Sequence, residues 1–281
     1  MKIGVFDSGL GGLIIMKAIK KALPEYDYVY LGDTKRVPYG NRSEEAVYEF
    51  TKQGVDYLFS RENCAIVIIA CNTASARALR RIQQEYLPKN FSRQGRGEPD
   101  RKVLGVLIPS AEESAKYNRV GVLGTLGTVL SETFPKEIKK ILALRNKSEG
   151  GNSKTKVFQN SAPMLVPLAE EGEIKNAKPF IQKYLQPLLN KKIDALVLGC
   201  THYPIFKKEI RKILPKNIKI ISQDELIPKK LKDYFARHQE VESKLSKKKT
   251  AKILVTDITH SVNKLSQKWF GKNIKPELVA I

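Results

Sequence analysis

The stretch Ile66-Val67-Ile68-Ile69-Ala70-Cys71-Asn72-Thr73-Ala74-Ser75 decides the predicted fold. Its short run of β-branched apolar residues is typical of a buried strand in a parallel sheet. The run ends at a cysteine, and polar residues that suit the first turn of a helix follow it. Residues 74–86 are then rich in Ala, Arg, Leu and Gln, which favour a helix. Cys71 is therefore predicted where a strand ends and a helix begins, the edge at which open α/β sheets bind ligands and a thiolate is favoured.

Strands and helices alternate through the rest of the chain. Apolar runs predict strands at 2–6, 28–31, 65–70, 103–108, 119–123, 156–159, 195–198, 218–221 and 253–255. Periodic segments predict helices at 13–23, 43–60, 74–86, 110–116, 164–171, 173–189, before 214, at 224–236 and at 261–270. Polar segments predict a loop at 90–100, a flexible stretch at 146–154 and a charged, mobile connection at 239–249. Strands separated by helices in this way indicate βαβ units and a parallel sheet.

The two halves of the chain resemble each other. Gly4-Val5-Phe6 with the glycines that follow is echoed by Gly121-Val122-Leu123 with Gly124 and Gly127, and each half later has an apolar strand that ends at Cys71 or Cys200. We therefore expect an α/β fold of two similar lobes, each a mostly parallel sheet flanked by helices, with the active site in the cleft between them. The predicted boundaries place 1–101 and 208–281 in the first lobe, with Cys71, and 102–207 in the second, with Cys200.

The composition is that of a globular protein with a strong positive charge. The 281 residues are 42% hydrophobic, which is enough for a sizeable core. The formal net charge is +21. Lys and Arg are spread along the chain, with denser patches at 136–147 and 244–252 but no nucleic-acid motif. This pattern favours a solvated basic surface over a nucleic-acid site, with a modest attraction for acidic substrates.

The sequence predicts a cytoplasmic protein with free thiols. Its first apolar stretch is too short for a signal peptide, and no apolar run approaches the roughly 18 residues of a membrane helix. Three cysteines do not make a disulfide framework, and a reducing compartment would disfavour a bond between Cys71 and Cys200. Cys64 lacks polar neighbours and is predicted to be a core residue.

Neither a metal nor an organic cofactor is expected. The three histidines, His202, His238 and His260, have no paired ligand spacing. Gly9-Leu10-Gly11-Gly12 departs from the dinucleotide-binding pattern, and its glycines are expected to let backbone N–H groups approach a small carboxylate. Pyridoxal phosphate would require a Schiff-base lysine with phosphate and pyridinium partners, which two thiols make unnecessary.

Two strand-end cysteines in mirrored contexts suit inversion of a carbon stereocentre. One group must remove the proton from one face of the carbon, and a protonated group must deliver a proton from the other. Thiols serve both roles because both their forms are accessible near neutral pH once the pKa is lowered. Asn72, Thr73 and Thr201, with backbone N–H groups at the helix starts, would hold a carboxylate.

Four motifs occur in the same order as in a known family. They are Asp7-Ser8-Gly9-x-Gly11-Gly12, Gly32-Asp33 with Pro38-Tyr39-Gly40, Ala70-Cys71-Asn72-Thr73-Ala74, and Gly199-Cys200-Thr201-His202-Tyr203-Pro204. Together they resemble the glutamate racemases of the aspartate/glutamate racemase family over nearly the whole chain. The resemblance implies two lobes with the substrate between them and a cofactor-independent interconversion of L- and D-glutamate for peptidoglycan synthesis. Homodimers are common in the family, and some members need a peptidoglycan precursor as activator, which no residue here decides.

The resemblance also implies roles for single residues. Cys71 and Cys200 match the two proton-transfer thiols, assisted by Asp7 and His202 respectively, and Glu170 matches an acid near the second thiol. The implied substrate contacts are Asp7, Ser8, Pro38, Tyr39, Gly40, Asn72, Thr73, Thr125, Thr128, Thr201 and His202, and Asp33 is expected to support the site near Cys71. Ala162 stands where relatives often have a cysteine, a departure that we expect to be silent for catalysis.

Other interpretations stay open from the residues alone. Asp7 suits a helix cap, Asp33 a turn, His202 a turn residue and Glu170 an exposed helix acid. Among enzymes, the alternative is a racemase of aspartate or another small acidic amino acid. Outside enzymes, it is a basic α/β protein that binds an acidic metabolite or nucleic acid without catalysis, although such a module has no need of paired thiols.

Overall fold

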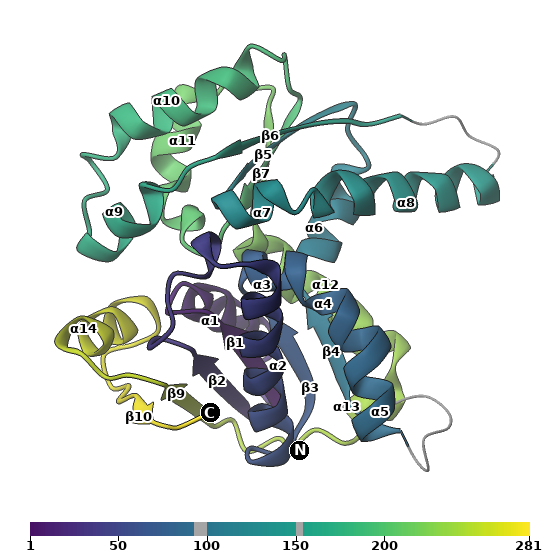
Figure 1. Ribbon diagram of the computed structural model, residues 1–281, viewed down its shortest axis with the longest axis vertical. Helices are drawn as coiled ribbons and strands as arrows, with labels where there is room; N and C mark the ends of the chain where they lie inside the picture. The colour runs from purple at the N-terminus through teal and green to yellow at the C-terminus, as the bar shows by residue number, and fades with distance from the viewer. Residues whose placement is uncertain (93–99, 150–153) are drawn as a thin grey trace. The chain divides into compact units, whose positions relative to one another are not determined.

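The computed structural model describes residues 1–92, 100–149 and 154–281, and the chain divides into two compact units. Unit 1 consists of Met1–Val106 and Ile227–Ile281, and unit 2 of Leu107–Leu226. Each unit has one parallel sheet flanked by helices (Figure 1). The prediction of an α/β fold with two similar lobes is thus confirmed.

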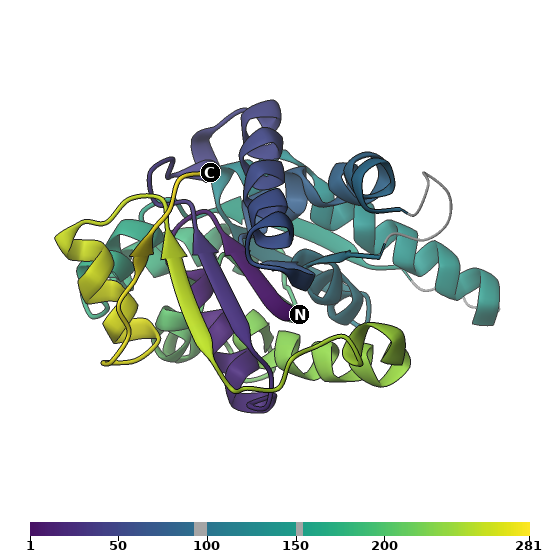
Figure 2. The same cartoon turned by 90° about the horizontal axis from the view of Figure 1, so that it is seen from below.

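Unit 1 contains a six-stranded sheet in which every pair of neighbours is parallel. Its strands are β1 (Lys2–Asp7), β2 (Tyr28–Gly32), β3 (Cys64–Ile69), β4 (Lys102–Gly105), β9 (Ala251–Val255) and β10 (Glu277–Leu278). They lie in the order β10-β9-β2-β1-β3-β4. Figure 2 shows β9, in yellow-green, beside β2, and β10, in yellow, beside β9, so the end of the chain completes the sheet that its beginning starts.

Helices cover both faces of this sheet, with α1 on one face and α2 on the other (Figure 2). The helices of unit 1 are α1 (Gly12–Ala22), α2 (Glu44–Ser60), α3 (Asn72–Arg77), α4 (Leu79–Arg81), α5 (Leu87–Phe91), α13 (Gln239–Glu242) and α14 (His260–Trp269), with the short 3₁₀ segment η1 (Tyr39–Asn41) and the π-helical η2 (Ile82–Tyr86). The boundary between the units falls inside α12 (Gln223–Arg237). The Ser43 side chain caps α2 by accepting from the Ala46 N–H at 3.2 Å, as its sequence predicts.

Unit 2 repeats the arrangement with four parallel strands. They are β5 (Arg119–Gly124), β6 (Lys156–Ser161), β7 (Ala195–Gly199) and β8 (Lys219–Ile221), in the order β6-β5-β7-β8. Its helices are α6 (Leu107–Ser114), α7 (Leu126–Leu130), α8 (Thr133–Glu149), α9 (Leu165–Glu171), α10 (Lys178–Leu189) and α11 (Lys207–Ile213), with the 3₁₀ segment η4 (Tyr203–Phe206). Its core joins α9, α10 and α11 to the sheet through residues such as Leu165, Leu185, Leu196 and Ile210.

The two sheets share one topology. In both, the first strand has the second on one side and the third on the other, and the fourth lies beyond the third: β2-β1-β3-β4 and β6-β5-β7-β8. The strand order reverses between the first and third strands, because the second strand lies on one side of the first and the third on the other. The carboxyl ends of such a pair form the crevice where open α/β sheets bind ligands. In unit 1, β1 ends at Asp7 and Cys71 follows β3. In unit 2, Thr125 follows β5 and Cys200 follows β7.

The boundaries between the units differ from those expected at 101/102 and 207/208. Strand β4 pairs with β3, so the chain stays in unit 1 as far as Val106. Strand β8 pairs with β7, so residues 208–226 belong to unit 2 instead of the first lobe. In both places the pairing of a short strand, which periodicity does not reveal, sets the boundary.

Several predicted elements also need correction. Residues 107 and 108, predicted to end a strand, begin α6, and the helix predicted over 74–86 is divided into α3, α4 and the π-helical η2. Residues 146–149, predicted as flexible, are the last turn of α8, while 93–99 and 150–153 lie outside the described residues. The predicted mobile connection at 239–249 is wrong, because it contains α13, buries Val241 and Leu245, and donates from the Ser246 N–H to the Met1 carbonyl at 2.7 Å.

Candidate functional site

Cys71 lies at the carboxyl edge of the unit 1 sheet, two residues after β3, and forms the N-cap of α3. Its sulfur accepts a hydrogen bond from Ser8 Oγ at 3.2 Å and one from the Ala74 N–H at 3.5 Å. Ser8 follows β1, the strand beside β3, so neighbouring strands bring the two side chains together. Donors that point at a sulfur stabilise negative charge on it, which suits a thiolate base.

Two tyrosines lie close enough to Cys71 for its charge to act on them. Burial raises the pKa of the Tyr30 and Tyr39 hydroxyls, and the negative charge of Cys71 is among the further causes in both. Tyr39 is a predicted substrate contact. Tyr30 was not predicted, because a tyrosine inside a strand has the same pattern as an ordinary core residue.

Asp7, at the end of β1, is held by the start of α1. Its Oδ2 accepts from the Gly9 N–H at 3.2 Å, the Gly12 N–H at 3.1 Å and Tyr30 Oη at 3.4 Å. A Cβ on Gly12 would lie 2.7 Å from Asp7 Cβ, so only glycine allows this approach. The glycines were expected to let backbone N–H groups approach a small carboxylate. In the structure, the N–H groups of Gly9 and Gly12 donate to the carboxylate of Asp7. Its role beside Cys71 stays a prediction.

Asp33 is a fully buried carboxylate that holds the loop carrying Tyr39. Its Oδ2 accepts from Tyr39 Oη at 2.5 Å and Arg36 Nε at 2.6 Å, and its Oδ1 accepts from Thr256 Oγ1 at 2.9 Å. The Arg36 guanidinium also stacks over the Phe50 ring at 4.3 Å. Asp33 therefore holds the Tyr39 hydroxyl directly, and its supporting role near Cys71 stays a prediction.

In unit 2, Cys200, His202 and Glu170 form a chain of polar contacts. Cys200 follows β7, and its sulfur lies 3.8 Å from His202 Nδ1. The other ring nitrogen, Nε2, lies 3.1 Å from Glu170 Oε1 in α9. His202 is buried, whereas 41% of the Glu170 side chain is exposed. The resemblance implied that His202 and Glu170 lie near Cys200, and the three side chains are in contact in the structure.

The surroundings of His202 favour its charged form. Burial alone would lower the pKa of His202, but hydrogen bonds and charge interactions with Cys200 and Glu170 outweigh it and raise the pKa to about 10. With both ring nitrogens protonated, Nδ1–H donates to Cys200 and Nε2–H donates to Glu170. An imidazolium in this position places a positive charge and a hydrogen-bond donor beside the Cys200 sulfur.

Thr125 and Thr128 lie at the carboxyl end of β5, the strand beside β7. Thr125 is the N-cap of α7, where its Oγ1 accepts from the Thr128 N–H at 3.3 Å, and the two hydroxyls are 3.0 Å apart. Tyr203 Oη donates to the carbonyls of Gly124 at 3.1 Å and Ala162 at 2.8 Å, which ties the turn after Cys200 to the ends of β5 and β6.

The remaining predicted contacts flank the same strand ends. Asn72 and Thr73 are buried in the first turn of α3, and Thr201 is buried directly after Cys200. Pro38, which follows a cis peptide bond, is exposed next to buried Tyr39, and Gly40 is half-buried. In each unit the predicted residues therefore follow strands of the sheet that carries the cysteine of that unit.

Cys64 differs from the other two cysteines. It begins β3 and is fully buried, and burial raises the pKa of its thiol to about 12. Arg101 donates to the Cys64 carbonyl at 2.6 Å, not to its sulfur. These facts confirm the interpretation of Cys64 as a core residue.

Two further properties concern residues 1–92, 100–149 and 154–281. Nowhere in that part of the chain do three or more His, Cys, Asp and Glu side chains group so that they could hold a metal ion. The helices described there include none that is both long and apolar enough to cross a membrane.

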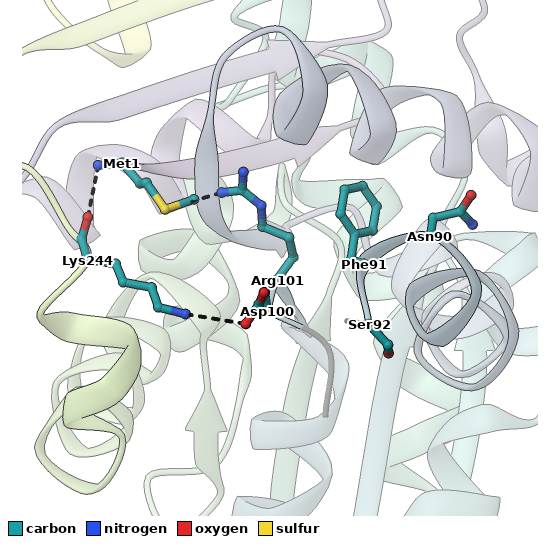
Figure 3. A pocket seen from close by; sticks show the side chains of 7 residues that line it. All are labelled: Met1, Asn90, Phe91, Ser92, Asp100, Arg101 and Lys244. Atoms are coloured by element: carbon teal, nitrogen blue, oxygen red, sulfur yellow. Dashed lines mark hydrogen bonds and ion pairs between the residues drawn. The ribbon is translucent and has the colours of Figure 1, made fainter. Parts of the chain in front are cut away.

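A pocket of about 480 Å³ lies at the opposite, amino-terminal edge of the unit 1 sheet (Figure 3). It is lined by Met1, Asn90, Phe91, Ser92, Asp100, Arg101 and Lys244. The Met1 ammonium donates to the Lys244 carbonyl at 2.8 Å, and Lys244 Nζ lies 3.9 Å from Asp100 Oδ1. The pocket contains none of the predicted site residues. The contacts of Lys244 with Met1 and Asp100 bind residues 239–249 to the sheet.

Thr256, directly after β9, contacts a predicted site residue, Asp33, although the sequence did not single it out. It reaches Asp33 across 223 positions of sequence. Only the pairing of β9 with β2 brings the two together, and a lone threonine in a charged segment carries no local signal of it.

Comparison with known proteins identifies relatives of one family. A family model described as Asp/Glu/Hydantoin racemase matches residues 3–223. The glutamate racemases of a Sulfurihydrogenibium species and of Aquifex aeolicus are 35% and 34% identical to this chain, and each alignment covers 100% of this chain and 98% of the relative. The crystal structure of the Francisella tularensis glutamate racemase in complex with D-glutamate superposes with a TM-score of 0.83 at 30% identity, covering 99% of this chain and 97% of that one. The chain belongs to the Asp/Glu/Hydantoin racemase family.

Proposed function

We propose that the protein is a glutamate racemase that interconverts L- and D-glutamate by proton transfer through Cys71 and Cys200. One observation carries the proposal: each unit places a cysteine at the same switch point of a sheet of the same topology, with polar partners on its sulfur. The relatives named above as glutamate racemases, including one described with D-glutamate, support the choice of substrate.

The proposed reaction takes one thiol from each unit. For L-glutamate, the Cys200 thiolate removes the Cα proton, which leaves a carbanion, and the Cys71 thiol then delivers its proton to the opposite face. For D-glutamate the roles exchange, so each turnover leaves one sulfur protonated and the other not. This assignment of direction rests on family analogy.

The partners of each sulfur fit these roles. His202, protonated because its pKa is raised, donates toward the Cys200 thiolate, and Glu170 orients the imidazolium from its other nitrogen. Ser8 Oγ and the Ala74 N–H donate to Cys71. Each set places hydrogen-bond donors beside the sulfur, and such donors suit a group that carries negative charge during the reaction.

The neutral polar groups fit the binding of a small dicarboxylate. Asn72, Thr73 and Thr201 flank the cysteines, and Thr125 and Thr128 end the strand beside β7. Hydroxyl, amide and backbone N–H donors can hold carboxylates without adding another basic group near Cα.

The test is racemisation in deuterated water without added cofactor. D- or L-glutamate is incubated with the protein, the loss of optical activity is followed by circular dichroism, and Cα deuterium in each enantiomer is measured early. A two-thiol mechanism predicts that the product enantiomer carries solvent deuterium while the remaining substrate keeps its hydrogen. Equal early labelling of both enantiomers would point to a single base.

The same assay separates the alternatives. Racemisation of aspartate in preference to glutamate would assign the protein to another acidic amino acid. If neither amino acid changes while the protein binds DNA with a steep salt dependence, a non-catalytic binding role replaces the enzyme.

The cellular part of the proposal is that this enzyme supplies D-glutamate for peptidoglycan synthesis, in the cytoplasm and as a homodimer. The proposed chemistry requires reduced thiols, and Cys64, Cys71 and Cys200, which all lie within the described residues, form no disulfide in the structure. Light scattering at micromolar concentration tests the dimer, and dependence of the growth of a racemase-deficient bacterium on this chain or on external D-glutamate tests the cellular role.

A further inference from the structure

The turn after β9 binds the loop of residues 33–40, which we call the substrate loop because it carries Tyr39 and Gly40. The Thr256 N–H extends the pairing of β2 with β9 by donating to the Gly32 carbonyl at 3.1 Å. Thr256 Oγ1 donates to Asp33 Oδ1 at 2.9 Å and accepts from the Lys35 N–H at 2.9 Å. One hydroxyl therefore holds both a side chain and the backbone of the substrate loop.

Asp33 connects Thr256 to Tyr39, because its carboxylate is hydrogen-bonded to both hydroxyls. Its Oδ2 accepts from Tyr39 Oη and from Arg36 Nε, while Thr256 occupies Oδ1. A carboxylate held at both oxygens cannot turn about its last bond, so the Tyr39 hydroxyl has a fixed partner. Without the Thr256 hydroxyl, the buried carboxylate would lose one of its hydrogen bonds and could rotate.

A second pair of contacts joins the same two segments. Thr34 Oγ1 donates to the Asp257 carbonyl at 2.8 Å and accepts from the Asp257 N–H at 2.9 Å. This pair is exposed, whereas the bond between Thr256 and Asp33 is buried. The buried contact is the one in which an unpaired group would be costly.

The amino ends of β2 and β9 provide an internal control. Asp27 and Thr250 precede β2 and β9, and Thr250 Oγ1 donates to Asp27 Oδ1 at 2.6 Å. Asp33 and Thr256 follow the same strands and form the same kind of bond. Both bonds fasten β9 to β2, but only the one at the carboxyl ends touches the substrate loop.

We propose that Thr256 is a positioning residue, whose hydroxyl fixes Asp33 and, through it, Tyr39 in the arrangement that receives the substrate. Thr256 lies outside residues 3–223, the part of the chain that the family model matches. As far as it concerns the reaction, the proposal rests on the proposed racemase function. The effect on the substrate loop can be measured without it.

The experiment compares Thr256→Val, which removes the hydroxyl, with Thr256→Ser, which keeps it, and with the control Thr250→Val. Hydrogen exchange of the 33–40 amides is measured by mass spectrometry, and KM and kcat for both glutamate enantiomers are determined. Should Thr256→Val not fold, Thr256→Ala takes its place. Thermal unfolding of every variant shows how much stability each has lost.

We expect Thr256→Val to speed exchange in the substrate loop and to lower kcat/KM by about tenfold, the size of effect given by one hydrogen bond to a charged group. The loss should lie mainly in KM, because a loop that contacts the substrate before and during the reaction affects both states alike. Thr256→Ser should restore both readouts. Thr250→Val should lower stability, speed exchange near 250 and leave KM unchanged.

Unchanged exchange of the substrate loop in Thr256→Val would overturn the proposal, as would an equal effect of Thr250→Val on that loop. Faster exchange with an unaltered kcat/KM in an active enzyme would also overturn it, since the loop would then not need this support. If the wild-type protein racemises no amino acid, the proposed function fails on its own, and the exchange data still decide whether Thr256 holds the loop.

Discussion

At Cys71 and Cys200 the same residue type meets two different sets of partners. Cys71 accepts from a hydroxyl and a backbone N–H, whereas Cys200 lies beside a histidine that is itself held by Glu170. The first set is neutral and the second carries charge. The two thiols of the proposed mechanism therefore need not be equivalent, although their strand positions are.

Replacing either thiol should nearly abolish racemisation. Because a serine hydroxyl is a far weaker acid than a thiol, we expect Cys71→Ser and Cys200→Ser each to lower kcat by about 10²- to 10⁴-fold. The rate is measured by circular dichroism from each enantiomer. Cys64→Ala is the matched control, a buried cysteine whose loss should lower stability but not kcat/KM. Near wild-type activity in either serine variant would contradict the two-thiol mechanism.

The raised pKa of His202 predicts a pH-dependent contribution to stability. A histidine that keeps its proton to higher pH in the folded state stabilises that state fully below its unfolded pKa of about 6.5. The contribution falls as the pH rises and is lost through the folded pKa of about 10. The free energy of unfolding of the wild type minus that of His202→Gln should therefore be largest near pH 6 and shrink toward pH 10.

Urea unfolding at pH values from 6 to 10 measures this difference. His238→Gln, at an exposed histidine beside Glu240, controls for the removal of a histidine elsewhere. A difference between the wild type and His202→Gln that stays constant over the range would mean that His202 stabilises the fold by packing alone.

Among the elements, those with local signals could be predicted and those held by distant contacts could not. The strand before Cys71, the helix that Ser43 caps and the strand before Cys200 follow from apolar runs and caps within a few residues. The apolar run at 103–108 suits a strand or a helix equally, and the structure divides it between β4 and α6.

Residues 239–249 are held by contacts with residues far away in the sequence, so their structure could not be predicted from local signals. Their charged composition is typical of a mobile connection, yet Asp27 and Met1, more than two hundred positions earlier, hold them. Nothing in the local composition reveals these partners. The same limit applies at the site, where the Cys71 and Cys200 positions were predictable from local motifs and Thr256 was not.

Asp27 should be the main support of this connection. Burial by itself would raise the pKa of Asp27, but hydrogen bonds from Ser246, Thr250 and Lys248 lower it to about 2. A carboxylate with a lowered pKa stabilises the fold above its unfolded pKa, and this contribution is lost as the pH falls through the folded value. We expect Asp27→Asn to cost about 2 kcal/mol at pH 7, with a smaller difference between pH 3.8 and 2.

Urea unfolding of Asp27→Asn and the wild type at pH 7, 5 and 3 gives the difference, and hydrogen exchange of 239–250 locates it. The racemisation rate provides the contrast, because Asp27 precedes β2 and is remote from its carboxyl end. Loss of activity without loss of stability in this variant would contradict a structural role.

For the whole molecule, the repeated topology explains why the family resemblance extends over both halves. The order β2-β1-β3-β4 recurs as β6-β5-β7-β8, and within the part of the chain that the structure describes only unit 1 adds further strands. Those strands, β9 and β10, come from the end of the chain. The repeat could be predicted from the glycine and cysteine patterns of the two halves, whereas the placement of β9 beside β2 depends on a pairing that no local pattern encodes.

The pairing of β9 with β2 has a consequence for biosynthesis. Strand β2 is buried along its whole length, and β9 covers one of its two edges. On the ribosome, β1, β2 and β3 are made some two hundred residues before β9, so β2 is an uncovered sheet edge in the nascent chain for most of its synthesis. An exposed edge of this kind pairs readily with other chains. The growing polypeptide is therefore most at risk of aggregation before residue 251 is added, and the Thr256 contact to the substrate loop is among the last to form.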